Sequence, residues 1–132
     1  MFIARLPKDK QESFLNLAYT MVYADNKLAE EEKKIFQSYQ LEVEAGLDKA
    51  HKVDFEKELA VFDDCDKVQQ NGVFFELYAI ALIDGVYAKE EEALINIAKE
   101  KFGITDEMMK QMRDGLQALT DAYKQLEKIV KV

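Results

Sequence analysis

The sequence contains one cysteine, one proline and no tryptophan among its 132 residues. The single cysteine, Cys65, excludes an internal disulfide and a zinc site built from several cysteines, and it suits a reducing compartment. The longest apolar run, 73–83, is interrupted by Glu76 and is shorter than the roughly 20 residues that span a bilayer. The N-terminal stretch lacks the apolar centre of a secretion signal. We therefore expect a cytoplasmic protein that does not insert into membranes.

Positive charge is scarce relative to negative charge. The chain has 18 Lys and Arg residues against 26 Asp and Glu residues, which gives a formal net charge of −8. Binding to DNA or RNA needs clustered cations that displace counterions from phosphates, so this balance argues against a nucleic-acid partner. An anionic membrane surface is disfavoured for the same reason. Cations and basic partners remain open.

Helical periodicity dominates the rest of the sequence. Apolar residues recur three and four positions apart, and β-branched runs typical of strands are missing. We predict an all-α fold, one domain over residues 1–132 with six to eight helices. A first helix is expected from about Pro7 to Asp25, and a weaker helix over 53–62. The run at 73–83 is apolar on every side, which is typical of a buried central helix.

Glycines are expected to mark the ends of these helices, because glycine weakens a helix interior and suits the position after its last turn. Gly103 is predicted to end a helix that begins near Ala88. Thr105 is a suitable N-cap for the segment that follows. Whether Gly115 divides that segment into two helices stays open.

The C-terminal segment, 105–131, is predicted to be strongly amphipathic. Its apolar residues alternate at spacings of three and four: Met109, Met112, Leu116, Leu119, Tyr123, Leu126 and Val130. This heptad-like pattern has two interpretations. In the favoured one, the segment covers the core of its own domain. In the other, it forms a seam between two copies, so the protein is expected to be a monomer or a homodimer.

The chain also contains an internal duplication. A shift of 59 residues aligns 17–32 (LAYTMVYADNKLAEEE) with 76–91 (ELYAIALIDGVYAKEE), and five of the sixteen positions are identical. Each copy reads as a buried helix, an acidic loop, and a helix that begins with glutamates. The copies extend over about 14–45 and 73–103. We predict two helical hairpins related by a pseudo-twofold axis.

The duplicated acids are the candidate site. They are Asp25, Glu32, Asp84 and Glu91, with Glu31 and Glu90 in support. In one interpretation the aspartates close two corners and the glutamates stabilise helix N-termini, as in a capping box. In the other, the twofold arrangement brings the carboxylates together as hard oxygen ligands for Ca²⁺ or Mg²⁺. Neither loop has the ligand spacing of an EF-hand.

These residues resemble the TerB-like family, named for tellurite-resistance protein B. The matching copies are Ala24-Asp25-Asn26-Lys27-Leu28 with Glu32, and Ile83-Asp84-Gly85-Val86-Tyr87 with Glu91. The resemblance covers about Phe14 to Gly103. It implies a pseudo-twofold helical bundle and a non-enzymatic module of bacterial stress-related or envelope-linked complexes, with acids associated with divalent cations. Asn26 replaces a glycine of the family pattern, and Ala29 and Ala88 stand where a capping hydroxyl is common.

Catalytic constellations are weak in this sequence. His51 is the single histidine, so a di-iron site with two His motifs is excluded. Cys65 lies among aspartates, which raise a thiol pKa and disfavour a reactive thiolate. We expect a non-catalytic binding module that acts through an unidentified protein partner. The alternatives are a small oligomerisation domain that uses its C-terminal seam, and a metal-dependent hydrolase.

Overall fold

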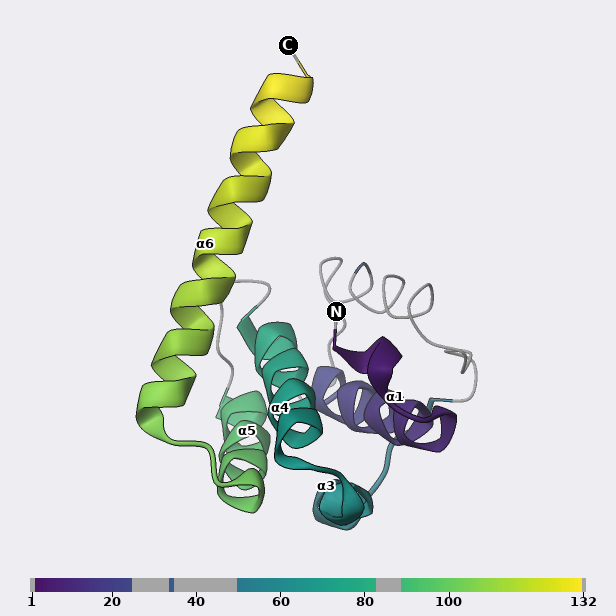
Figure 1. Ribbon diagram of the computed structural model, residues 1–132. Helices are drawn as coiled ribbons and strands as arrows, with labels where there is room; N and C mark the ends of the chain where they lie inside the picture. The colour runs from purple at the N-terminus through teal and green to yellow at the C-terminus, as the bar shows by residue number, and fades with distance from the viewer. Residues whose placement is uncertain (1, 25–33, 35–49, 83–88, 132) are drawn as a thin grey trace.

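The computed structural model describes residues 2–24, 34, 50–82 and 89–131 (Figure 1). Their regular structure is helical, which confirms the all-α prediction. The elements in chain order are η1 (Ile3–Arg5), α1 (Lys8–Val22), α3 (Phe55–Leu59), η3 (Ala60–Asp64), α4 (Lys67–Leu82), α5 (Lys89–Phe102) and α6 (Asp106–Val130). In these ranges, no helix combines the length and the apolar content needed to cross a bilayer.

Both duplicated loops lie outside the described residues, at 25–33 and 83–88, as does 35–49. The pseudo-twofold repeat and the count of six to eight helices therefore stay predictions of the sequence. The described part contains the first helix of each proposed copy, α1 and α4, and the helix α5 that follows the second loop.

Helix α4 is the centre of the described fold, and it packs against both α1 and α5 (Figure 1). Its second half is buried on every side, as predicted, through Val73, Phe74, Leu77, Tyr78, Ala79, Ile80 and Ala81. The helix begins at Lys67, six residues earlier than the apolar run indicates. The reason is a reciprocal N-cap, in which the Gln69 N–H donates to Asp66 Oδ1 at 2.8 Å and the Asp66 N–H donates to Gln69 Oε1 at 3.0 Å.

Helix α1 begins directly after Pro7, as predicted, and contributes one apolar stripe to the core. The residues of this stripe, Phe14, Leu17, Ala18, Met21 and Val22, are all fully buried. On its other side, α1 contacts the short α3. The predicted helix at 53–62 is present as α3 followed by the 3-10 helix η3.

The prediction that glycines mark helix ends is confirmed at Gly103 and wrong at Gly72. Gly103 has φ +65°, and the Ile104 N–H donates to the Lys99 carbonyl at 2.9 Å, which closes α5 in a Schellman arrangement. Gly72 lies inside α4, where an added Cβ would stand 3.0 Å from Cβ of Phe2. The close approach of the N-terminal segment therefore favours glycine at Gly72, since a larger residue would have to displace Phe2 by a few tenths of an ångström.

Gly115 does not divide the C-terminal segment, because α6 is continuous over 25 residues. Thr105 is the N-cap of this helix, as predicted, and its Oγ1 accepts the Met108 N–H at 3.1 Å. The open alternative of two C-terminal helices is thus resolved in favour of one.

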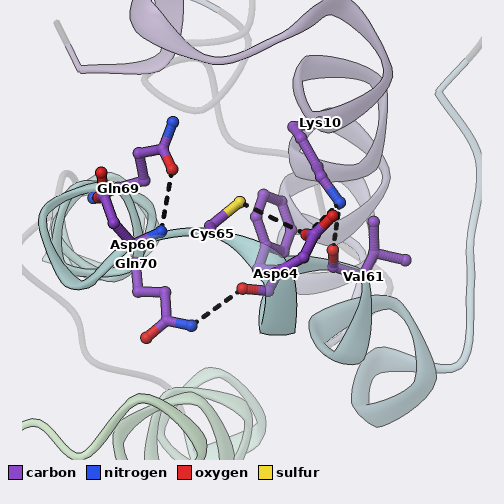
Figure 2. A network of polar contacts seen from close by, with 8 residues as sticks. Lys10, Val61, Asp64, Cys65, Asp66, Gln69 and Gln70 are labelled. Atoms are coloured by element: carbon purple, nitrogen blue, oxygen red, sulfur yellow. Dashed lines mark hydrogen bonds and ion pairs between the residues drawn. The ribbon is translucent and has the colours of Figure 1, made fainter.

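A polar network fixes the junction of η3 and α4 to α1 (Figure 2). Lys10 Nζ of α1 lies 2.7 Å from Asp64 Oδ1 and also donates to the Val61 carbonyl. Gln70 Nε2 of α4 donates to the Phe62 carbonyl at 2.9 Å. The acidic group at 63–66 therefore serves two elements, since Asp64 is held by α1 while Asp66 caps α4.

The Lys10–Asp64 contact makes stability depend on pH at both extremes. The hydrogen bond from Lys10 lowers the pKa of Asp64 below 3.8, and its bond to Asp64 raises the pKa of Lys10 above 10.5. A lowered carboxyl pKa stabilises the fold above the unfolded pKa, and this contribution disappears as pH falls through the folded value. A raised amine pKa stabilises the fold below the unfolded pKa, and this contribution disappears as pH rises through the folded value.

We therefore expect Lys10→Met to be most destabilising between about pH 5 and pH 9. The difference in unfolding free energy from wild type should shrink at more acid and more alkaline pH. Urea titrations across the pH range measure this difference. Lys8→Met, which changes an exposed lysine of the same turn, is the matched control. A Lys10→Met difference that does not vary with pH would contradict the assignment.

Candidate functional site

The structure describes two of the six candidate acids. Glu90 and Glu91 lie in the first turn of α5, where Glu90 is exposed and Glu91 is 2% exposed. Asp25, Glu31, Glu32 and Asp84 lie outside the described residues. Among the residues that are described, no group of three or more His, Cys, Asp or Glu side chains gathers as a metal site would require. The Ca²⁺ or Mg²⁺ site thus stays a prediction.

Two other residues singled out in the sequence, His51 and Cys65, have defined surroundings. His51 is exposed, and its backbone N–H donates to Asn16 Oδ1 at 3.1 Å. Burial raises the pKa of the Cys65 thiol, and the charges of Asp64 and Asp66 add to this effect, which is the opposite of thiolate activation.

Glu76, which interrupts the apolar run at 73–83, is buried at 5% exposure. Its Oε1 accepts the backbone N–H of Phe2 at 3.1 Å. This contact ties the N-terminal segment to α4, on the side of the helix where Gly72 admits Phe2. Glu76 therefore positions the N-terminal residues.

Helix α6 carries a largely exposed apolar face. It follows the body over its first turns, where Met108, Met109, Met112 and Leu116 are half-buried. Beyond that point it extends clear of the other described helices (Figure 1). The apolar side chains there are largely exposed: Leu119 49%, Tyr123 65%, Leu126 59%, Ile129 67% and Val130 80%.

The favoured prediction for this segment is therefore correct only for its first half. The seam packs against the core as far as Met112, and the prediction is wrong for Leu119, Tyr123, Leu126 and Val130. The physical reason is length, since a helix of 25 residues extends about 37 Å and exceeds the body it packs on. We call the apolar face of residues 112–130, which is half-buried at Met112 and Leu116 and exposed from Leu119 on, the α6 stripe.

A groove lies where the α6 stripe meets the body. It encloses a volume of about 420 Å³ and is lined by Phe2, Val68 and Phe75 on one side and by Met112, Gly115, Leu116 and Leu119 on the other. Val68 is 75% exposed, and Phe2 packs edge-on against Phe75 with ring centroids 5.6 Å apart. Since Leu119 belongs to both features, the groove and the stripe form one apolar surface, which we call the α6 surface.

We call the groove itself the α6 groove, and two local features shape it. Gly115 leaves its wall open, because an added Cβ there would meet no atom within 4 Å. Asn71 also lines the groove, and its buried Oδ1 accepts no hydrogen bond within the described part of the chain. A buried acceptor without a partner carries a desolvation cost in the folded protein.

The two edges of the stripe differ, because charged residues lie along one of them. In heptad notation, Met109, Leu116, Tyr123 and Val130 occupy a, and Met112, Leu119 and Leu126 occupy d. One flank, position g, carries Met108, Gly115, Ala122 and Ile129, and is apolar. The other flank, position e, carries Arg113, Thr120 and Glu127. The α6 surface is therefore bordered by one positive and one negative side chain on a single edge.

Comparison with known proteins gives no relative, since no protein-family model, curated protein or solved structure matches this chain. The TerB-like resemblance stays a prediction from the sequence. The seam residues of the α6 surface were identified from their spacing. The participation of Phe2 and Val68 was not, because they lie in segments without apolar periodicity.

Proposed function

We propose that the protein is a non-catalytic helical interaction domain and that its binding surface is the α6 surface. The observation that carries this proposal is the exposure of five large apolar side chains on one face of a single projecting helix. Contiguous exposed apolar patches of this kind are characteristic of protein–protein interaction sites. An amphipathic helix in an apolar groove is also a common mode of recognition.

The energetics of α6 support the same conclusion. Most helical stability in proteins comes from packing of an apolar face, and isolated helices of fewer than about 15 residues are marginal in water. Residues 119–130 contribute no buried side chain to the described core. Their apolar face gains free energy only when another surface covers it.

Hydrogen exchange tests this proposal. At about 1 µM protein, a concentration that disfavours weak association, we expect the amides of 119–130 to exchange much faster than those of α4. The reason is that the exposed turns open independently of the core. Exchange is followed by mass spectrometry of peptides from each helix.

Slow exchange of 119–130 in a verified monomer would overturn the proposal, because it would mean that the same chain covers the stripe. Leu126→Lys provides the matched variant. It should leave exchange in α4 unchanged, since Leu126 contacts no buried residue of the described core.

We propose as a second candidate the role implied by the TerB-like resemblance, a binding module of stress-related or envelope-linked complexes with a divalent cation between the acidic loops. The burial of Glu91 at the start of α5 supports this role. A carboxylate at 2% exposure is costly to bury, and buried charges are commonly paired or coordinate a metal ion. Thermal melting with EDTA, Ca²⁺ and Mg²⁺ separates the two roles of the acids. A rise in Tm that Asp25→Ala with Asp84→Ala abolishes supports a metal site, and destabilisation without any metal effect supports structural corners.

A further inference from the structure

We propose that the occupant of the α6 surface is a second copy of this chain, bound antiparallel. This inference rests on the proposed function and names the partner. In the dimer, the last turns of each α6 lie in the α6 groove of the other copy. The arrangement is isologous, so one patch serves both copies and the contact closes at two molecules.

The register follows from the heptad positions. In an antiparallel pair, a residues of one helix meet d residues of the other, and the arrangement centred near residue 121 uses the whole stripe. It pairs Met112 with Val130, Leu116 with Leu126, and Leu119 with Tyr123, each in both directions. The overlap of 112–130 is about 27 Å long at 1.5 Å per residue.

The same register brings opposite charges together on the e flank. Antiparallel helices place e beside e, and the pairing near residue 121 sets Arg113 of each copy opposite Glu127 of the other. Thr120 of one copy lies beside Thr120 of the other, between these two ion pairs. In the single chain, the Glu127 carboxylate makes an exposed contact with Lys131 Nζ at 3.6 Å, which stabilises little.

The apolar flank is complementary in size. There g lies beside g, so Gly115 of one copy meets Ile129 of the other, and Ala122 meets Ala122. Gly115 is the open wall of the α6 groove, and Ile129 is 67% exposed in the single chain. The open wall of the groove in one copy thus has room for the large side chain at the exposed end of α6 in the other copy. Phe2 and Val68 of the body add apolar contacts beside the paired helices.

A parallel pair satisfies none of these relations. It would set e against g, so that Arg113 would face Met108 and Glu127 would face Ala122, with no ion pair. It would also leave both α6 grooves empty of the other helix's last turns. Charge and shape therefore select the antiparallel arrangement.

The first measurement is sedimentation equilibrium from about 1 µM to about 1 mM, the range in which weak homodimers form. We expect a monomer–dimer equilibrium. Arg113→Glu or Glu127→Arg alone should each raise the dimer Kd about tenfold, because two ion pairs become two repulsions. The double variant should return the Kd to within about threefold of wild type. Lys128→Glu, which changes a charge at f on the opposite face, is the control.

The second measurement fixes orientation through a nitroxide label on Lys131→Cys in a Cys65→Ser background. The antiparallel register places the two Lys131 positions about 30 Å apart along the helix axis, at 1.5 Å per residue. A parallel pair would hold them side by side. Double electron–electron resonance distinguishes these distances.

Every outcome of these two measurements either supports or overturns the antiparallel dimer. Dimers whose charge-reversal variants rescue each other, with labels far apart, support the proposal. Dimers without rescue, or with labels close together, overturn the antiparallel arrangement. A monomer at every concentration overturns the dimer. Hydrogen exchange of 119–130 then shows whether the proposed function, binding through the α6 surface, fails with it. Fast exchange retains the proposed function for a different protein partner, and slow exchange contradicts both.

Discussion

Replacing Phe62 by alanine is expected to lower the free energy of unfolding by about 3–5 kcal/mol. The ring is fully buried and meets Phe102 edge-on, with centroids 6.4 Å apart and an interplanar angle of 89°. Phe62 belongs to η3 and Phe102 to the last turn of α5. The substitution therefore removes apolar burial and also a contact that joins two separate elements, and it leaves a cavity that the surrounding core closes only partly.

Urea titration of the single and double variants at Phe62 and Phe102 measures both parts of this effect. We expect a coupling energy of about 0.5–1.5 kcal/mol from the edge-on contact. Tyr123→Ala is the control, because this aromatic ring is 65% exposed on the stripe. In dilute monomer it should change the unfolding free energy by less than about 0.5 kcal/mol. Equal losses at Phe62 and Tyr123 would contradict the division into core and stripe.

The second large effect is expected at Thr20, where valine should cost about 1–3 kcal/mol. Its Oγ1 donates to the Asn16 carbonyl at 2.8 Å and accepts the Val53 N–H at 3.0 Å. Thr20 is 8% exposed, so water has little access to replace the lost acceptor. Valine preserves the shape of the side chain and leaves the Val53 N–H without its partner.

Thr20→Ser separates the hydrogen bonds from the packing. Serine keeps the hydroxyl and loses one methyl group, so we expect a smaller loss than with valine. Chemical denaturation measures both losses, and exchange of the Val53 amide should accelerate only in Thr20→Val. A serine variant that is less stable than the valine variant would show that the methyl group, and not the hydroxyl, matters here.

Much of the described fold is predictable from the sequence, because burial imposes local patterns. The start of α1 after Pro7, the all-round apolar second half of α4 and the N-cap at Thr105 each follow from the sequence pattern. The start of α4 was not, because Lys67–Gly72 has no apolar periodicity and its stop signal, Gly72, serves a close approach instead. A glycine in the sequence does not reveal which of these two constraints it meets.

The candidate site was less predictable for a similar reason. Spacing identified the α6 stripe but could not decide what covers it, because core-facing and partner-facing helices share one periodicity. The apolar g flank through Ile129 is a further signal, since it widens the face beyond a single seam. The acids at Asp25, Glu32 and Asp84 lie outside the described residues, so their role rests on the duplication.

The short connection between α5 and α6 has a consequence for how the length of this chain can vary. Only Gly103, Ile104 and Thr105 separate the two helices, and both helix ends are fixed by hydrogen bonds. One residue added between Thr105 and Met112 would rotate everything after it by about 100° around the helix axis. The stripe would then point away from the α6 groove. Related chains should therefore tolerate extensions after Val130 and reject single-residue insertions before Met112.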